Sequence, residues 1–361
     1  MAGLSMWGGL LMFSTYRTED VTILLKDITG MVEPMGTRQR EEMIQKGHHY
    51  SEMLPIEYEP TTKYLSAYYD ALRRYAKVTA EAVATVSEKI YRQKRGGTVL
   101  VSLARAGTPI GILIKHYLQK RYGSNVPHYT ISIIRGLGID RNAMDYILAR
   151  HKPESIQFVD GWTGKGAIQT ELQKAMEDYP AVSAGLAVLS DPAYVSEKCG
   201  THEDFLIASS CLNSTVSGLL SRTFLREEII GQEDFHGAVF YKDLSDKDLT
   251  YQFINAVEKE FPPAARLDEE FAGTTGSGIQ EVRKIAAEYD IKNINLIKPG
   301  IGEATRVLLR RLPWKLLVYS LHDEGRLGHL YELAEEKGVE VVEYPLQNYL
   351  ACGLIQSLAD N

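Results

Sequence analysis

The spacing of hydrophobic residues changes along this chain of 361 residues. In residues 65–95 apolar side chains recur every three or four positions, which predicts a long amphipathic helix. After Gly96 and Gly97, short continuous apolar runs alternate with longer segments of helical periodicity. Such runs are typical of parallel strands that are buried on both faces and joined by right-handed crossover helices. The pattern therefore predicts an α/β fold with a doubly wound, mainly parallel sheet.

The elements of this sheet domain can be placed along the chain. Strands are expected at 98–102, 128–134, 155–160 and 186–190, and crossover helices at 109–122, 141–150 and 166–178. A further helix at 248–261 ends before Pro262 and Pro263. Ligands bind beyond the carboxyl ends of parallel strands. The site is therefore expected in the loops at 103–108, 135–140, 160–166 and 191–211.

The last part of the chain has the pattern of a second, smaller α/β sandwich. We expect strands at 294–297, 316–319 and 339–344, helices at 301–311 and 327–337, and a closing helix. The small, polar residues 271–278 indicate a flexible connection before it. The predicted organisation is an irregular and helical cover (1–95), the sheet domain (96–262), a linker (263–278) and the small domain (279–361).

Composition limits the possible functions. Hydrophobic residues make up 44% of the chain and charged residues 24%, which excludes global disorder. Because 40 Lys and Arg face 47 Asp and Glu, any site for a polyanion must be local. The three cysteines have no CxxC spacing, which argues against disulfides and structural zinc and indicates a reducing compartment. We expect a cytoplasmic protein without a secretion signal or a membrane span, and no metal ligands are assigned.

The stretch 156–169 contains a candidate phosphate-binding loop. An apolar strand ends at Asp160, and a glycine-rich turn then leads into a helix. The turn contains Gly161, Thr163, Gly164, Lys165 and Gly166. Backbone N–H groups in such a turn, together with the dipole of the helix N-terminus, can hold a phosphate. The layout resembles the phosphoribosyl diphosphate (PRPP) loop of type I phosphoribosyltransferases, which implies that Asp160 binds the ribose and the turn binds the 5′-phosphate.

A second loop extends this resemblance. Ala104, Arg105, Ala106 and Gly107 follow the first strand of the sheet and are similar to the diphosphate loop of uracil phosphoribosyltransferases. The resemblance implies that Arg105, with Arg135 from the loop at 135–138, stabilises the departing diphosphate. It also implies Mg²⁺ bound together with PRPP.

The implied reaction is the transfer of phosphoribosyl from PRPP to a nitrogen base or an RNA-linked acceptor, with release of diphosphate. The partners implied are PRPP and a small-molecule acceptor, with RNA as a further partner through the end of the chain. No motif in the sequence identifies the acceptor base. The sequence is compatible with a homo-oligomer.

A cysteine in the segment 191–224 supports a different function. Cys211 is surrounded by Ser, Thr and Asn residues, and an expected helix near Asn213 could lower the pKa of its thiol. Chains with this organisation have been labelled cysteine proteases of the StiP type, so a cysteine hydrolase using Cys211 is the alternative. The candidate bases are His49, His202 and His236, although Cys211 could equally be a packing residue.

The C-terminal region resembles the RNA-binding domain shared by Pelota, release factors and kink-turn-binding ribosomal proteins. The residues that match its lysine, its glycine-rich turn and its basic helix are Lys298, Gly300, Gly302, Glu303, Arg306 and Arg310. Five basic residues face Glu303 alone between residues 298 and 315, which gives a local basic face. The resemblance implies RNA binding, and it leaves a non-catalytic, PRPP-sensing RNA-binding regulator as a third hypothesis. This pairing of domains is associated with bacterial tellurite-resistance and stress gene clusters.

Overall fold

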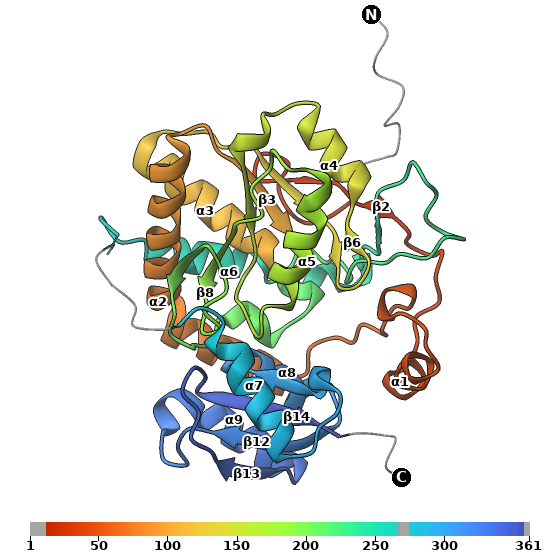
Figure 1. The fold of residues 1–361 in the computed structure, drawn as a ribbon, viewed down its shortest axis with the longest axis vertical. Helices are drawn as coiled ribbons and strands as arrows, with labels where there is room; N and C mark the ends of the chain where they lie inside the picture. The colour runs from red at the N-terminus through yellow and green to blue at the C-terminus, as the bar shows by residue number, and fades with distance from the viewer. Residues whose placement is uncertain (1–11, 266, 268–273, 357–361) are drawn as a thin grey trace, which may run out of the picture.

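The computed structural model describes residues 12–265, 267 and 274–356. Figure 1 shows a larger α/β part above a smaller C-terminal part, with α1 (Thr37–Gln45) to one side. Residues 266 and 268–273 of the predicted linker lie outside the described residues. None of the helices in the described part of the chain has the length and apolar character needed to cross a membrane.

The larger part is built on a six-stranded sheet in which every neighbouring pair is parallel. Its strands, in spatial order, are β1 (Thr22–Ile23), β4 (His128–Ile131), β3 (Val99–Leu103), β7 (Ile156–Val159), β8 (Leu186–Ser190) and β9 (Lys198–Thr201). Strands β3, β7 and β8 are buried at every position, as continuous apolar runs require. The parallel α/β sheet predicted from the sequence is therefore confirmed.

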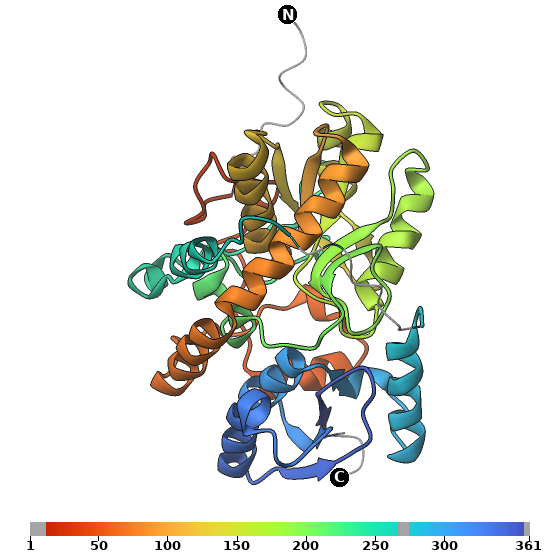
Figure 2. The same cartoon turned by 90° about the vertical axis from the view of Figure 1, so that its left-hand side faces the viewer.

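Helices cover both faces of this sheet (Figures 1 and 2). One face packs against α2 (Thr62–Lys94), α3 (Gly107–Tyr122) and α6 (Thr250–Lys259), and the other against α4 (Arg141–Leu148) and α5 (Ala167–Ala175). Strand residues alternate between the two cores: Leu100 joins the first and Val101 the second. Helix α2 is one continuous helix of 33 residues that packs on β8 and β9 with its apolar face.

The N-terminal region differs from the irregular cover that the sequence predicts. It supplies the edge strand β1 to the main sheet and the strand β2 (Lys26–Asp27), which pairs with β10 (Gly237–Ala238). Strands of two residues are too short to show a period in the sequence. A second small feature is the hairpin of β5 (Ile133–Ile134) and β6 (Gly138–Ile139), which continues the chain beyond β4.

The C-terminal part is an α/β sandwich with a four-stranded mixed sheet. Its strands, in spatial order, are β11 (Ile297–Pro299), β14 (Ala351–Ile355), β12 (Pro313–Val318) and β13 (Glu340–Glu343). Its helices are α7 (Ser277–Glu288), α8 (Ile301–Arg310) and α9 (Glu324–Lys337). The expected closing helix is wrong: the last described element is the fully buried strand β14, which pairs on both sides.

The two parts share an apolar core. Residues of α8, among them Ile301, Ala304 and Leu308, belong to the same buried cluster as residues of α2 and α3. Asp204, from the segment after β9, accepts hydrogen bonds from the backbone N–H groups of Ile301 (3.0 Å) and Leu350 (2.8 Å). This carboxylate caps the start of α8 and fixes the C-terminal part against the loops at the carboxyl ends of the strands.

Candidate functional site

A cavity of about 630 Å³ lies where the loops after β5 and β7 meet the C-terminal part. The N-terminal segment between Arg40 and Tyr50 and the segment at Arg222 contribute further walls. Its basic lining residues are Arg40, Arg135, Lys165, Arg222, Lys298, Arg306 and Arg311, and its acidic ones are Asp160 and Glu303. A chain of net charge −7 therefore holds a local, strongly positive cavity, which suits a ligand with several negative charges.

Asp160 lies directly after β7 and lines this cavity. Its carboxylate accepts a hydrogen bond from the backbone N–H of Gly161 at 2.7 Å. Burial raises the pKa of Asp160 to about 7, although the Gly161 N–H group and Arg306 act in the opposite direction. A carboxyl group with a strongly raised pKa inside a basic cavity is typical of a functional site.

The predicted phosphate loop runs from Gly161 to Gly166, and all of it except Gly161 lines the same cavity. Gly166 has a φ of +85° at the start of α5, a conformation that favours glycine. The loop is fixed by hydrogen bonds to other segments: the Thr163 hydroxyl donates to Asp191, and the Gly164 carbonyl accepts from the Tyr349 hydroxyl at 2.6 Å. The C-terminal part therefore holds the loop directly.

Lys165 makes a second link to the C-terminal part. Its ammonium group donates to the backbone carbonyls of Ile294 and Ile297, the latter at 3.1 Å. Desolvation lowers the pKa of Lys165 to about 7, and the neighbouring charges of Lys298 and Arg135 act in the same direction. An anion in the cavity would favour the charged form of this lysine.

Arg135 lies at the turn of the β5–β6 hairpin and lines the cavity, as the sequence predicts for a residue near the site. Its guanidinium donates to Asn295 of the C-terminal part at 2.8 Å. Its backbone is held by the N-terminal segment, because its N–H donates to the Tyr50 hydroxyl at 3.0 Å and its carbonyl lies 3.0 Å from His49 Nε2. Three parts of the chain thus meet at this residue.

Arg105 has a different environment from the one the sequence predicts. Its guanidinium donates to the Leu220 carbonyl (2.9 Å) and to Asn213 Oδ1 (2.8 Å), and it is not among the lining residues of the cavity. Ala106 does line the cavity, whereas Ala104 does not. At Gly107 a Cβ atom would come within 2.4 Å of the Val159 carbonyl, so this glycine permits close packing against β7.

Comparison with known proteins places the chain in a family. Residues 14–258 match the model of the "tellurite-like stress resistance cysteine protease StiP", and residues 276–357 match the PELOTA RNA-binding domain. A protein of Acinetobacter baylyi named "Cysteine protease StiP" is 37% identical over 364 residues, which cover 95% of this chain and 94% of that protein. The chain belongs to the StiP family.

Two solved structures are distant neighbours of this StiP family member. They are the Helicobacter pylori xanthine-guanine-hypoxanthine phosphoribosyltransferase (18% identity, TM-score 0.24) and a Bacillus anthracis hypoxanthine-guanine phosphoribosyltransferase (14% identity, TM-score 0.26). They cover 32% and 35% of this chain, and 74% and 77% of their own. Similarity this weak carries no argument about activity.

The family name directs attention to the cysteines. Cys211 has no exposed surface, its carbonyl accepts a hydrogen bond from Arg310 at 2.8 Å, and it ends a short 3-10 helix (Ala208–Cys211). The α-helix expected near Asn213 is wrong, because only a 3-10 turn (Ser214–Val216) forms there. Burial raises the pKa of the Cys211 thiol to about 12, which is the opposite of what an activated nucleophile needs.

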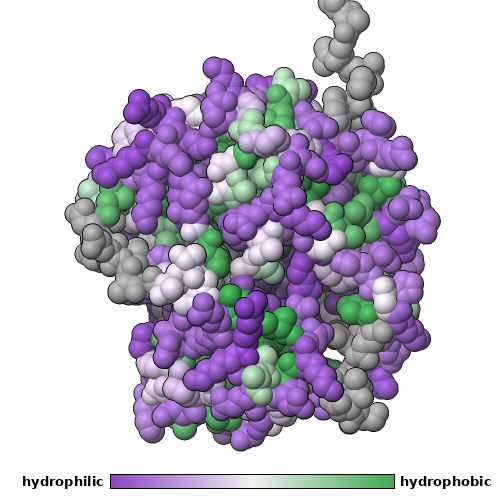
Figure 3. All heavy atoms as spheres, viewed as in Figure 1, coloured by the Kyte–Doolittle hydropathy of each residue, from purple (hydrophilic) through white to green (hydrophobic). Residues whose placement is uncertain are grey.

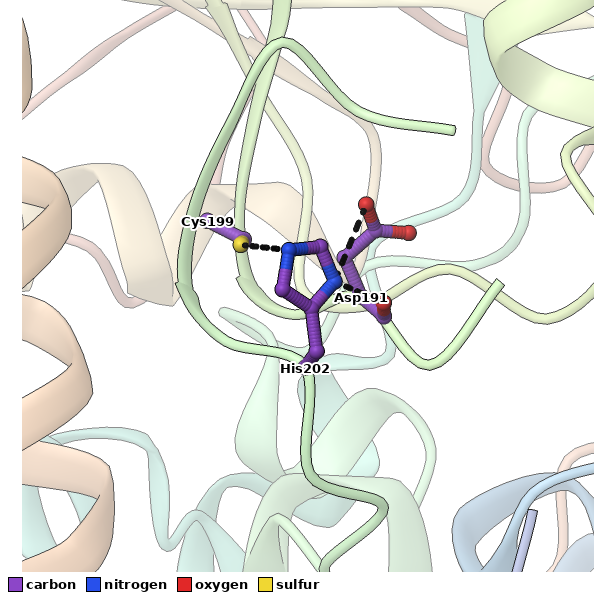
Figure 4. A group of neighbouring side chains, drawn as sticks. All are labelled: Asp191, Cys199 and His202. Carbon is purple, nitrogen blue, oxygen red and sulfur yellow. Dashed lines mark hydrogen bonds and ion pairs between the residues drawn. The ribbon is translucent and has the colours of Figure 1, made fainter. Parts of the chain in front are cut away.

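A second cysteine, which the sequence analysis did not select, lies beside a histidine (Figure 4). Cys199 Sγ, on β9, is 3.4 Å from His202 Nε2, and the other ring nitrogen of His202 is 2.6 Å from the Asp191 backbone carbonyl. The Asp191 carboxylate lies 3.8 Å from the same nitrogen and accepts hydrogen bonds from Val195 and Ser196. Burial raises the pKa of Cys199 to about 12. The spacing of Cys199 and His202 was the only signal for this cluster in the sequence.

The described cysteines are therefore expected to resist alkylation in the native protein. Because Cys199, Cys211 and Cys352 are all buried, iodoacetamide at neutral pH should leave them unmodified for hours, whereas all three should react after unfolding in urea. Mass spectrometry of the intact protein measures this. Rapid modification of one cysteine in the native protein would contradict the expectation and would identify a reactive thiol.

The residues predicted to bind RNA divide into two groups. Lys298, Glu303 and Arg306 line the cavity, and Arg306 pairs with Glu303 at 3.1 Å. Gly300, Gly302 and Arg310 instead face the α/β part. A Cβ atom at Gly302 would lie 3.2 Å from the Ser210 hydroxyl, so a larger residue there would press against the other part of the molecule.

Several lining residues carried no signal in the sequence. Arg40 and Arg222 come from segments without a recognisable motif, and only the folded chain brings them to the strand ends. Burial lowers the pKa of Arg222 to about 10, and Arg40 acts in the same direction. Trp162 belongs to the predicted phosphate loop but was given no role, although it lines the cavity beside Arg306.

Proposed function

We propose that this member of the StiP family transfers a phosphoribosyl group from PRPP to a nitrogen nucleophile. The observation that carries the proposal is the basic cavity, which holds one strand-end carboxylate, Asp160, among seven basic side chains. PRPP has a matching distribution of groups, because its ribose hydroxyls lie between a 5′-phosphate and a diphosphate. In the reaction, the bond between the ribose C1 and the diphosphate oxygen breaks, a C1–nitrogen bond forms, and the nitrogen loses a proton.

The roles follow from the positions of the side chains. Asp160 would accept hydrogen bonds from the ribose hydroxyls, and the turn from Gly161 to Gly166 would hold the 5′-phosphate with its backbone N–H groups. Arg135 would stabilise the charge that develops on the departing diphosphate. Arg105 is better described as a residue that positions the segment at Asn213, because its donors are already used there.

The cavity fits a magnesium ion that arrives with its substrate. Its lining contains two carboxylates, Asp160 and Glu303, and Glu303 is already paired with Arg306. Asp160 is therefore the side chain that would approach such an ion, whose other ligands would be phosphate and ribose oxygens. When bound, Mg²⁺ would neutralise charge on the diphosphate.

Thermal unfolding with and without ligand tests this function. PRPP with Mg²⁺, at about a hundred times its dissociation constant, should add about 2.7 kcal/mol to the free energy of unfolding and raise the Tm. Ribose 5-phosphate, which lacks the diphosphate, should have a smaller effect. An unchanged Tm at millimolar PRPP would contradict the proposal.

The affinity for inorganic diphosphate should depend on pH because of Lys165. Its pKa of about 7 means that this ammonium group is charged below neutral pH and loses its proton as the pH rises. We expect the contribution of Lys165 to diphosphate affinity to fall as the pH rises through about 7, with a matching difference in proton uptake between the wild type and Lys165→Gln. Calorimetry in buffers of different ionisation enthalpy measures both quantities.

Lys165→Gln should weaken binding, and it should do so more at pH 6, where the Lys165 ammonium group is charged, than at pH 9. The matched control is Lys174→Gln, which changes an exposed lysine on α5 that does not line the cavity. A pH profile that is the same in wild type and Lys165→Gln would show that another group causes it.

A second candidate function is a thiol hydrolase centred on Cys199. The specific observation that favours it is the Cys199–His202–Asp191 arrangement, together with the name of the family. His202 would remove the thiol proton, and the thiolate would attack a carbonyl carbon to form an acyl-enzyme that water then hydrolyses. Hydrolysis of labelled casein that is lost in Cys199→Ala and retained in Cys211→Ala would support it. Equal activity in all three proteins would exclude it.

A further inference from the structure

Three of the residues that the sequence assigned to RNA lie in the same cavity as several residues that it assigned to PRPP. Lys298, Glu303 and Arg306 of the C-terminal part face the cavity that Asp160 and Lys165 line from the α/β part. The two parts are also joined across this boundary by the hydrogen bonds of Lys165 and Tyr349. Lys298, Arg306 and Arg311 of the C-terminal part therefore form one wall of the cavity.

Aromatic side chains from other segments complete this wall. The guanidinium of Arg306 lies 5.6 Å from the ring centroid of Trp162, and Glu303 is hydrogen-bonded to Trp162. Across the cavity, the Tyr50 ring lies 4.6 Å from the Arg222 guanidinium. The sequence of the C-terminal part contains basic residues without a row of aromatics, and the fold supplies the aromatic rings from elsewhere. Proteins that bind single-stranded nucleic acids combine basic side chains, which bind the phosphates, with aromatic rings, on which the bases stack.

We infer that the acceptor side of the cavity binds a nucleotide, either free or at the end of a single RNA strand. Lys298 and Arg306 would bind its phosphate groups, and the base would stack on Trp162. This inference rests on the proposed function and deepens it, because it names the class of the second substrate. The C-terminal part would then be half of the substrate site.

The dimensions of the cavity support a terminal nucleotide over a longer nucleic acid. A volume of about 630 Å³ is within the usual range of small-ligand sites. An RNA duplex, which is read across its wide minor groove, would need an open surface. The start of α8 cannot offer one, because Asp204 caps it and Gly302 packs against Ser210.

Equilibrium binding of defined probes to the full chain tests the inference. The probes are the four nucleoside monophosphates and a short, fluorescently labelled single-stranded RNA with a 5′-phosphate. Trp162→Leu, Lys298→Gln and Arg306→Gln should each weaken binding by about tenfold or more. Trp162→Phe keeps an aromatic ring and should retain most of the affinity, which separates stacking from a folding defect. The control Arg283→Gln removes an exposed charge on α7 and should have no effect.

The pattern of losses decides the result. Dependence on Trp162, a residue of the α/β part, together with Arg306 supports a shared site, and binding of the monophosphates distinguishes a free nucleotide from an RNA end. RNA binding that responds to Arg283→Gln and ignores Trp162→Leu would overturn the inference, as would the absence of binding by every probe. If the wild type fails to bind PRPP but binds nucleotides through Trp162, the proposed transferase fails while the nucleotide site stands.

Discussion

Asp160→Asn is expected to abolish PRPP binding while making the protein more stable at neutral pH. The loss of binding follows from the position of Asp160, since its carboxylate is the one acidic group after β7 that could accept the ribose hydroxyls. The gain in stability follows from its pKa. A carboxyl with a folded-state pKa of about 7 and an ordinary value of 3.8 opposes folding increasingly as the pH rises between these values.

The size of the stability effect can be estimated. Asparagine has no charge to desolvate and can still accept the hydrogen bond from Gly161, so we expect a gain of about 2 kcal/mol in the free energy of unfolding at pH 7. The gain should disappear near pH 4, where Asp160 is protonated in the folded state. Urea unfolding at both pH values measures it. Glu177→Gln, at an exposed site, is the matched control.

A loss of stability in Asp160→Asn at pH 7 would contradict the account, because it would make Asp160 a structural residue. Unchanged PRPP binding in a folded Asp160→Asn protein would contradict the assigned role of the carboxylate in ribose binding.

The second large effect is expected at Asn213, which connects two arginines behind the cavity. Its side-chain oxygen accepts from Arg105 at 2.8 Å and also from Arg310 of α8. Asn213→Ala would leave both partly buried guanidinium groups without this acceptor. We expect a loss of about 2 to 3 kcal/mol in the free energy of unfolding, measured by urea denaturation.

Asn213→Asp provides a rescue variant of nearly the same shape. Burial, together with repulsion from Arg306 and Arg105, lowers the pKa of Arg310 to about 9, so a carboxylate at position 213 would be attracted to this cluster. We expect Asn213→Asp to be at least as stable as the wild type. If Asp and Ala at this position destabilise the protein equally, the two arginines do not depend on the acceptor.

The main sheet could be predicted from the sequence because its strands are buried on both faces. Half-exposed strands alternate apolar and polar residues, whereas the runs at β3, β7 and β8 are continuously apolar. Glycines or acidic residues flank these runs. The loop from Asp160 to Gly166 could be predicted as a candidate phosphate site for the same reason, because it directly follows a strand whose end is clear in the sequence.

The errors have equally specific causes. The run at β14 is short and apolar, and such a run has no period that separates a strand from a buried helix. It forms a strand because it pairs with both β11 and β12, and these pairings involve residues that are distant in the sequence. The region after Cys211 has the hydrophobic spacing of a helix, but tertiary packing holds it in 3-10 turns.

The site was only partly predictable because it is assembled from distant segments. Arg40 and Tyr50 lie between β1 and β3 along the chain, Arg222 follows the last strand of the sheet, and Lys298 belongs to the C-terminal part. No local spacing connects them. Arg105 shows the reverse case. Its loop has the expected sequence and position, but the acceptors at Asn213 and Leu220, which lie more than a hundred residues away, turn its guanidinium from the cavity.

Calorimetric titration of the full chain with PRPP and Mg²⁺ tests the central claim, that the basic cavity is a PRPP site, most directly. We expect saturable binding in the micromolar range. We also expect loss of the binding signal in Asp160→Asn and weaker binding in Lys165→Gln. The claim would be contradicted if the wild type did not bind PRPP. It would also be contradicted if Asp160→Asn and Lys165→Gln bound PRPP as strongly as the wild type.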